Sequence, residues 1–277
     1  MRSDNGELNK VKVNKAVIVA GGVIASSHFL MRSGLSGNAG KRMSCNFAFP
    51  FTFEFEEELK AYDGNQITLG ACDPSNRAVF ETYFNPPASF SLASVPFYFD
   101  RRNKIMKNYC RLMNIGALVG SEPNGIINRK ADLINGQAFD WELGKTDKEN
   151  IRYAFSTLLQ IGLNAGALKA ILPMKPGVEI ILSKENINNF NSCFAEYPMR
   201  IQDLLIGTAH PQGGNIMAGN KSVHKNERVL NSDFCVEGLK NVYVADASVF
   251  PESLGLNPQL TIMAMSSMAS KKVLENS

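Results

Sequence analysis

The sequence lacks the long apolar runs and the cysteine pattern that mark several classes of protein. No apolar stretch reaches the ~18 residues of a membrane span, and the polar N-terminus has no apolar core of the signal-peptide type. The five cysteines are odd in number and widely spaced, without a CxxC pair. These absences argue against a membrane span, a zinc site or a disulfide framework, and they favour a cytoplasmic protein with reduced thiols.

Charge of one sign is also scarce, and several site motifs are missing. The formal net charge is +3 over 277 residues, and the basic residues are scattered instead of forming a stripe with interleaved aromatics, which argues against nucleic-acid binding. The sequence has no G-x-G-x-x-G fingerprint, no His-x-x-x-His pair and no Ser-His-Asp order. Its 44% hydrophobic content is that of a globular protein with a sizeable core.

The two ends of the chain carry strand–turn–helix patterns. The apolar run AVIVA at 16–20 fits a strand that is covered on both faces of a parallel sheet. Gly21 and Gly22 break this run, in a turn of the kind that faces phosphates with backbone N–H groups. The elements expected at the two ends are a strand at 8–20, a helix at 26–34, a strand at 242–245 and a helix at 258–274.

The middle of the chain has a different pattern, in which antiparallel strands mix with helices. The segment FAFPFTFEF at 47–55 alternates and predicts a half-buried antiparallel strand. Asp147 is the expected N-cap of a long helix. The remaining elements expected here are aromatic strands or loops at 80–84 and 97–99, and helices at 101–113, 147–167 and 187–195.

These patterns predict a fold of class α/β plus α+β. Residues 1–35 and 206–277 are expected to form the remnant of a parallel-sheet, nucleotide-binding layer. Residues 36–205 are expected to form a mixed, largely antiparallel substrate-binding domain that packs against it.

The start of the last expected helix is a candidate site. Asn257 is a favoured N-cap residue and Pro258 suits the first helical position. Because the helix is apolar nearly all round, its start is expected inside the protein, where free N–H groups favour an anion. The alternative is a capped core helix whose start faces no ligand. Asp246 ends the preceding strand, where it could accept a ligand hydroxyl or cap the next turn.

His210 is the second candidate. It stands in GTAHPQGG, where Pro211 and the glycine pair after it predict an irregular, close-packed loop. A positioned histidine suits general-base work near neutral pH. The alternative is a structural histidine, and a hydrolase with His210 as its base has no nucleophile motif to accompany it.

Three segments together resemble, in order and at plausible spacing, the C-terminal portion of the glucose–methanol–choline (GMC) family of FAD-dependent oxidoreductases. They are VIVAGGVIASSHFLMRSG, AHPQGG and NVYVADASVFPESLGLNPQLTIMA. The stretches ETYFNPPASFSL and LVGSEPNG further resemble the long-chain or fatty-alcohol oxidase-like members. The resemblance implies FAD as cofactor and oxidation of a small-molecule alcohol, of long-chain or other apolar type, by hydride transfer to the flavin.

The resemblance also assigns residues. His210 corresponds to the family's active-site histidine, which accepts or steers the hydroxyl proton, and Asn257 stands where members carry a second histidine or an asparagine that binds the substrate oxygen. The implied cofactor contacts are Gly21 and Gly22 near the dinucleotide, Asp246 and Ala247 at the ribityl and phosphate region, and Asn257, Pro258 and Gln259 at the flavin ring.

The sequence departs from the family at one point, because the family's N-terminal βαβ unit with G-x-G-x-x-G is missing. Without that unit, the strands at 8–20 and 242–245 are expected to expose apolar faces and unpaired edges. Two hypotheses follow. The chain is the catalytic half of an enzyme completed by a separate N-terminal FAD-binding half or cut short in gene prediction, or it is a non-catalytic remnant or binding module that does not hold FAD alone.

Overall fold

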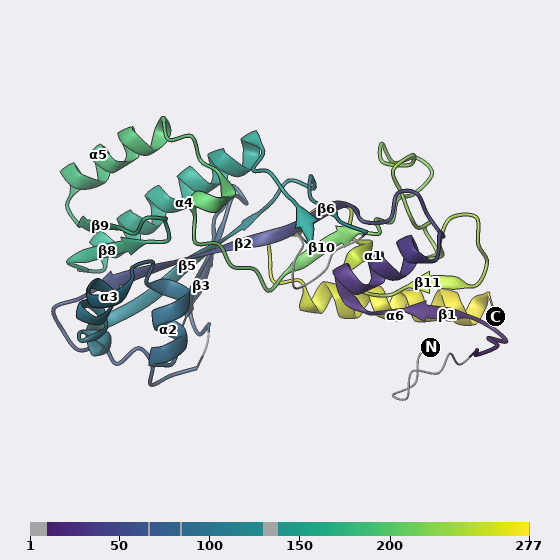
Figure 1. Cartoon of the computed structure of the whole chain (residues 1–277), viewed down its shortest axis with the longest axis horizontal. Helices are drawn as coiled ribbons and strands as arrows, with labels where there is room; N and C mark the ends of the chain where they lie inside the picture. The colour runs from purple at the N-terminus through teal and green to yellow at the C-terminus, as the bar shows by residue number, and fades with distance from the viewer. Residues whose placement is uncertain (1–9, 66, 84, 130–137, 277) are drawn as a thin grey trace.

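The computed structural model describes residues 10–65, 67–83, 85–129 and 138–276 of the chain. Figure 1 shows an elongated molecule with two lobes. The small lobe contains strand β1 (Val17–Val19), helix α1 (Gly22–Arg32), strand β11 (Val242–Val244) and helix α6 (Gln259–Glu275). The large lobe is built around strand β2 (Lys41–Glu54), which runs from one lobe into the other. Within the described ranges, no helix is long and apolar enough to cross a bilayer.

β1 and β11 form the short parallel sheet of the small lobe, as the sequence predicts. Val17 lies opposite Val242 and Val19 opposite Val244, in runs of β-branched residues that favour extended backbone. β1 is shorter than expected, because the described residues before Val17 are not in a strand, and the expected start of the strand at residues 8 and 9 lies outside the described residues. The prediction that both faces are covered is wrong, since Ile18 is 56% exposed.

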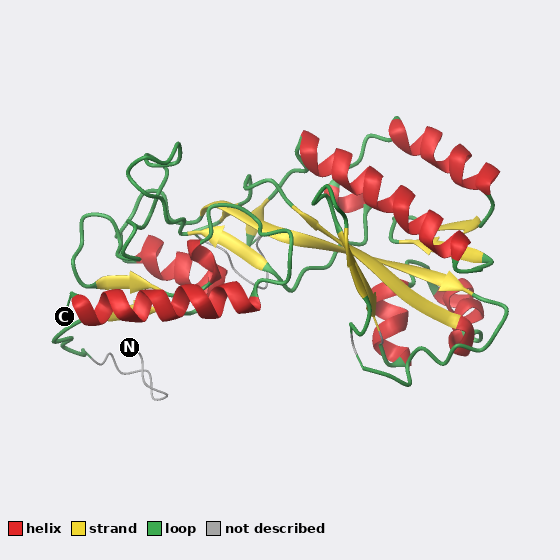
Figure 2. Cartoon of the chain, turned by 180° about the vertical axis from the view of Figure 1, so that it is seen from behind, coloured by secondary structure: helices red, strands yellow, loops and turns green. Residues whose placement is uncertain are grey.

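Helix α6 lies along the surface of the small lobe (Figure 2). Ala269 packs inward, and the Ser266 hydroxyl donates to the carbonyl of Ala245 over 3.0 Å. The outward face is apolar, with Leu260 81% and Met263 61% exposed. The prediction that the start of this helix lies inside the protein is therefore wrong in the described structure. The expected exposure of apolar surface is found on β1, but not on β11, where Tyr243 and Val244 are buried. The apolar surface exposed on α6 was not expected.

The large lobe contains a sheet that is antiparallel throughout its described strands, which confirms the predicted mixed class. The sheet order is β3-β4-β5-β2-β8-β9, and β10 pairs with β2 beyond the reach of β8. Apart from β2, its strands are β3 (Gly70–Cys72), β4 (Val79–Tyr83), β5 (Leu112–Gly120), β8 (Lys169–Leu172), β9 (Val178–Ile181) and β10 (Pro211–Gly214). A two-stranded ribbon of β6 (Ile126–Ile127) and β7 (Phe139–Asp140) lies beside the end of β2.

Helices cover both faces of this sheet (Figures 1 and 2). α4 (Lys145–Asn164) and α5 (Lys184–Ala195) lie on the face that carries the aromatic side chains of β2, while α2 (Pro87–Ser94) and α3 (Phe99–Met106) lie on the other. β2 is therefore more buried than the half-buried strand predicted from its alternation. Asn46 and Thr52, on its non-aromatic face, are fully buried.

Three local predictions in the large lobe need correction. Phe99 begins α3 instead of belonging to an aromatic strand, and the helix expected to reach Met113 ends at Met106, because Leu112 starts β5. Asp147 is not the N-cap of α4 but lies in its first turn. Its carboxylate accepts from the backbone N–H of Gly144 over 2.9 Å, so it caps the helix from within.

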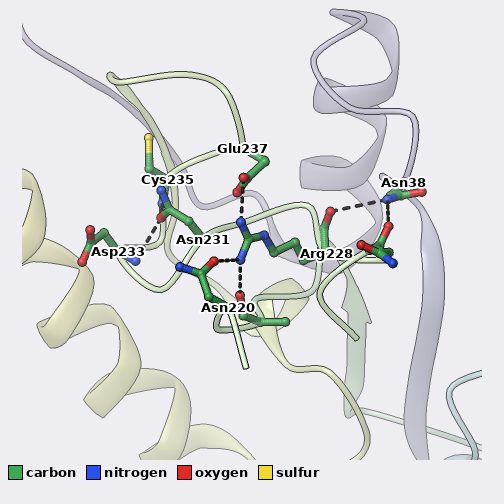
Figure 3. A network of polar contacts seen from close by, with 9 residues as sticks. Asn38, Asn220, Arg228, Asn231, Asp233, Cys235 and Glu237 are labelled. Atoms are coloured by element: carbon green, nitrogen blue, oxygen red, sulfur yellow. Dashed lines mark hydrogen bonds and ion pairs between the residues drawn. The ribbon is translucent and has the colours of Figure 1, made fainter. Parts of the chain in front are cut away.

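The long segment between β10 and β11 is held by side-chain contacts (Figure 3). The Arg228 guanidinium donates to the carbonyl of Ala218, to Asn220 Oδ1 and to Glu237 Oε1, over 3.1, 2.8 and 2.6 Å. Asn38 Nδ2 donates to the carbonyl of Arg228 over 3.5 Å and so ties the segment to the residues after α1. One arginine thus keeps this irregular segment folded against the small lobe.

Candidate active site

The border between the two lobes is organised by one buried side chain, Asn46 of β2. Its Nδ2 donates to the carbonyl of Leu256 over 2.7 Å and lies 3.3 Å from Nδ1 of His210. Its Oδ1 accepts from the hydroxyl of Ser253 over 2.6 Å. Asn46 therefore joins the histidine to the loop that leads into α6, and this loop carries Asn257.

His210 immediately precedes strand β10, whose Pro211 lies opposite Cys45 of β2. The prediction of an irregular loop is thus wrong for the residues after His210, although His210 itself lies outside the strand. Its backbone N–H donates to the hydroxyl of Thr208 over 3.0 Å. Burial lowers the pKa of His210, because the partly buried ring loses solvation that the charged imidazolium needs.

The glycine pair after His210 has a steric reason. Gly213 has φ +74°, and a Cβ there would lie 2.2 Å from the backbone oxygen of Arg42. Gly214 has φ +95°, and the register with β2 shifts between these two residues. Such a bulge needs residues without a side chain. The pair lets β10 leave β2 and approach α1, which fixes the position of the histidine before it.

Asn257 is exposed, and its side chain does not cap α6. Its Nδ2 donates instead to Oε1 of Glu81, a buried residue of β4, over 3.0 Å. Burial raises the pKa of Glu81, and the hydrogen bond from Asn257 opposes that rise. Asn257 thus lies against the sheet of the large lobe, on the face that carries Asn46. Pro258, next in the chain, is buried, and Gln259 begins α6 on the surface.

Asp246 and the turn Gly21–Gly22 lie together and are joined by the chain's own hydrogen bonds. One carboxylate oxygen accepts from the N–H of Gly22 over 3.0 Å and from the Ser26 hydroxyl. The other accepts from the N–H and the hydroxyl of Ser248 over 2.9 and 2.6 Å. A carboxylate has about four lone-pair positions, and these four bonds occupy them. Asp246 thus caps the short turn that starts at Ala247 and locks it to the start of α1.

Two residues of this site were missed from the sequence, Asn46 and Glu81. Both interrupt strands rich in aromatic residues, in MSCNFAF and VFETYF. A polar residue in such a strand is the signal that could have found them, because a buried polar group needs partners. The alternation of β2 was interpreted as solvent exposure of one face, and this concealed the signal.

A cavity of about 370 Å³ lies on the opposite face of the β2–β10 pair. Its lining is mostly apolar and includes Phe47, Trp141, Ile206 and Pro211, together with the polar residues Lys175 and Thr208. Gly207, Thr208 and Pro211 all line it, so the segment around His210 forms one of its walls.

The C-terminal region of the chain matches a recognised class of redox protein. Residues 130–266 match the family model described as GMC oxidoreductase. By this C-terminal region the chain belongs to the GMC oxidoreductase family. The resemblance noted in the sequence is therefore confirmed at the level of the family.

Individual relatives span more than this chain. It is 26% identical over 270 residues to an uncharacterized GMC-type oxidoreductase of Sinorhizobium fredii, covering 94% of this chain and 50% of that protein. It is 22% identical to a long-chain-alcohol oxidase of Arabidopsis thaliana, over 99% of this chain and 38% of the relative. The crystal structure of a pyridoxine 4-oxidase from Mesorbium loti shares its fold, with a TM-score of 0.62 at 12% identity, covering 95% of this chain and 52% of that one. The chain thus spans about half the length of these proteins or less.

Proposed function

We propose that this chain carries the catalytic and substrate-binding part of an FAD-dependent enzyme that oxidises an alcohol. The observation that carries the proposal is the network around Asn46, which joins His210 to the loop of Asn257 at the border of the two lobes. A proton-handling side chain that a buried amide ties to the loop of a second amide suits work on a hydroxyl group. Membership of the GMC family supports the redox class.

The residues fit a flavin at one end of the site. The N-terminus of α6 has no side-chain cap, and Asn257 and Gln259 beside it are exposed. Free N–H groups and the positive end of a helix favour the negative charge of a reduced flavin ring. FAD, when bound here, would supply the hydride acceptor, with Asn257, Pro258 and Gln259 at the edge of its ring.

The fit is poorer at the dinucleotide end. The four acceptor positions of Asp246 and the N–H of Gly22 are already used within the chain. A ribityl hydroxyl could therefore bind Asp246 only by replacing one of these bonds. Gly21, Gly22 and Ala247 can then serve the cofactor mainly by shaping the backbone around it.

The chain's own residues would act on the alcohol as follows. His210 accepts or steers the hydroxyl proton, and Asn257 hydrogen-bonds the substrate oxygen and holds it in place. Glu81 holds the amide of Asn257 through a hydrogen bond of 3.0 Å. Asn46 holds both the histidine and the loop before α6.

The exposed apolar surface of the small lobe supports a partner for this chain. Ile18, Leu260 and Met263 are all more than half exposed, and apolar surface of this kind marks a face that another structural element covers. We propose that an N-terminal FAD-binding portion, of the same polypeptide or of another, packs on this face and supplies the phosphate cradle. A non-catalytic binding module is the competing hypothesis, and it predicts no flavin in either arrangement.

The substrate class we propose is a long-chain or other apolar alcohol. Long-chain-alcohol oxidases are among the relatives.

The test begins with cofactor retention. The chain is purified alone and together with an N-terminal FAD-binding portion of a GMC relative, and flavin absorbance is measured after gel filtration. We expect flavin in the combined sample. Anaerobic mixing with a long-chain alcohol should then bleach the flavin, and His210→Ala should slow this reduction by about 100-fold or more while flavin remains bound.

His224→Ala is the matched control, because His224 pairs with Glu227 on the surface, away from the site. It should reduce at the wild-type rate. Absence of flavin from both samples would refute the enzyme hypothesis, and an unchanged rate in His210→Ala would remove His210 from the reaction.

A further inference from the structure

We infer that Asn46 is a positioning residue that fixes which ring nitrogen of His210 carries the proton. Asn46 holds Nδ1 of His210 as a hydrogen-bond acceptor, so the neutral ring carries its proton on Nε2. In the proposed reaction, on which this last step rests, His210 then presents a hydrogen-bond donor to the alcohol oxygen. Of the two roles open to His210, it steers the hydroxyl and does not act as its base.

The hydrogen bonds of Asn46 fix the orientation of its amide. A backbone carbonyl only accepts hydrogen bonds, so the amide atom 2.7 Å from the carbonyl oxygen of Leu256 must be the NH₂ group. The other amide atom is then the oxygen, and it accepts from the hydroxyl of Ser253 over 2.6 Å. Both ends of the amide have partners in this orientation, whereas the reversed amide would place two acceptors against each other at Leu256.

The Asn46 amide also determines the protonation of the His210 imidazole. The same NH₂ group lies 3.3 Å from Nδ1 of His210. An NH₂ group only donates, so Nδ1 must be the unprotonated nitrogen of a neutral ring. A proton on Nδ1 would set two donors against each other inside a network in which Asn46 is fully buried.

The charged form of the His210 ring is disfavoured for two reasons. An imidazolium carries a proton on both nitrogens, so it meets the same clash at Nδ1 and also loses solvation. Burial already lowers the pKa of His210. Both effects act in the same direction and keep the ring neutral, with Nε2–H as its outward group. A histidine acting as a base would need Nε2 free, and this network does not provide that.

The tautomer can be measured without cofactor or substrate. The full chain is labelled with ¹⁵N in its histidines, and long-range proton–nitrogen correlation spectra report which ring nitrogen carries hydrogen. The sequence has three histidines, so comparison with His210→Gln assigns the signal. We expect Nε2–H for His210 in the wild type. A wild-type ring with its proton on Nδ1 would overturn the inference, whatever any variant does.

The sharper experiment reverses the contact with an isosteric change. In Asn46→Asp, a carboxylate oxygen replaces the NH₂ group. The carbonyl of Leu256 repels this oxygen, and Nδ1–H of His210 is the donor that it can accept from. We expect the proton to move to Nδ1 and the pKa of His210 to rise by about one pH unit or more. Asn124→Asp, an exposed amide whose Nδ2 bonds the carbonyl of Glu142, makes the same charge change elsewhere and should leave the tautomer unaltered. An Nε2–H ring retained in a folded Asn46→Asp chain would overturn the inference.

The loaded enzyme separates this inference from the proposed function. With flavin bound, Asn46→Asp should move the pH profile of flavin reduction by alcohol, and Asn124→Asp should not. If His210→Ala reduces flavin normally, the proposed function fails while the tautomer result stands. If His210→Ala is slow but the Asn46→Asp profile is unmoved, the donor role of His210 fails and the proposed function stands.

Discussion

The two lobes of this chain bury their apolar residues to different degrees. In the large lobe, Phe49, Phe51 and Phe53 are fully buried between the sheet and α4, and helices cover both sheet faces. In the small lobe, the parallel sheet has two described strands, Ile18 is 56% exposed and Leu260 on α6 is 81% exposed. The sheet of the large lobe is closed on both faces by its own helices, although Phe99 on α3 is 87% exposed, whereas the sheet of the small lobe leaves Ile18 exposed.

This difference explains where the candidate site lies. Asn46 belongs to the longest strand of the closed lobe, and Leu256 belongs to a loop that leaves the open one. The rigid lobe thus supplies the frame of the site, and the open lobe supplies the segment that carries Asn257. We expect mutations to show the same division.

The largest expected effect is a loss of packing in the closed lobe. Phe51 has no exposed surface and meets the Phe155 ring edge-on at 4.8 Å, so Phe51→Ala should lower the free energy of unfolding by about 3 to 5 kcal/mol. Ile18→Ala in the open lobe should change it by about 0.5 kcal/mol or less. Urea denaturation of both variants measures this contrast, and equal losses would mean that the lobes are packed alike.

A smaller effect is expected where Asp246 locks the open lobe. Asp246→Asn places an NH₂ group against at least one donor, either at Gly22 and Ser26 or at Ser248, and should cost about 1 to 3 kcal/mol. Amide exchange should quicken at the first turn of α1 and stay unchanged in β5. Asp63→Asn, on the exposed surface, is the control. Faster exchange in β5 as well would show that the lobes do not respond separately.

The smallest effect is a pH dependence from Glu81, at the border of the lobes. Burial raises the pKa of this carboxyl, so its contribution to stability is full below the ordinary pKa of glutamic acid and is lost as the pH rises through the raised value. From about pH 4 to about pH 8, the wild type should lose stability relative to Glu81→Gln. Thermal unfolding across this range measures it, with Glu252→Gln as an exposed control. Parallel curves for wild type and Glu81→Gln would contradict the prediction.

Local patterns in the sequence predicted much of the fold. The apolar run before Gly21 identified β1, the alternating phenylalanines identified β2, and NPQL identified the start of α6 to within one residue. Each of these signals is contained within a few neighbouring residues. The family resemblance and the mixed fold class also rest on such local signals, and both are confirmed. The domain boundaries at 35 and 205 and the roles of the site residues stay predictions.

What the sequence could not show depends on contacts between distant residues. Burial of the non-aromatic face of β2 follows from partners more than a hundred residues away, such as Leu256 against Asn46. The pairing of Asn257 with Glu81 spans 176 positions. Exposure of Leu260 was missed because an apolar helix was assumed to be enclosed. Periodicity reports which residues share a face, but it does not report what lies against that face.

β2 also determines how the site can move. Its 14 residues run without interruption through the border of the lobes, hydrogen-bonded to β5 on one side and to β10 and β8 on the other. Hinge motions need a few residues whose backbone is free to rotate, and each residue of β2 from Met43 to Glu54 pairs with at least one neighbouring strand. This pairing opposes a hinge motion of the two lobes about β2.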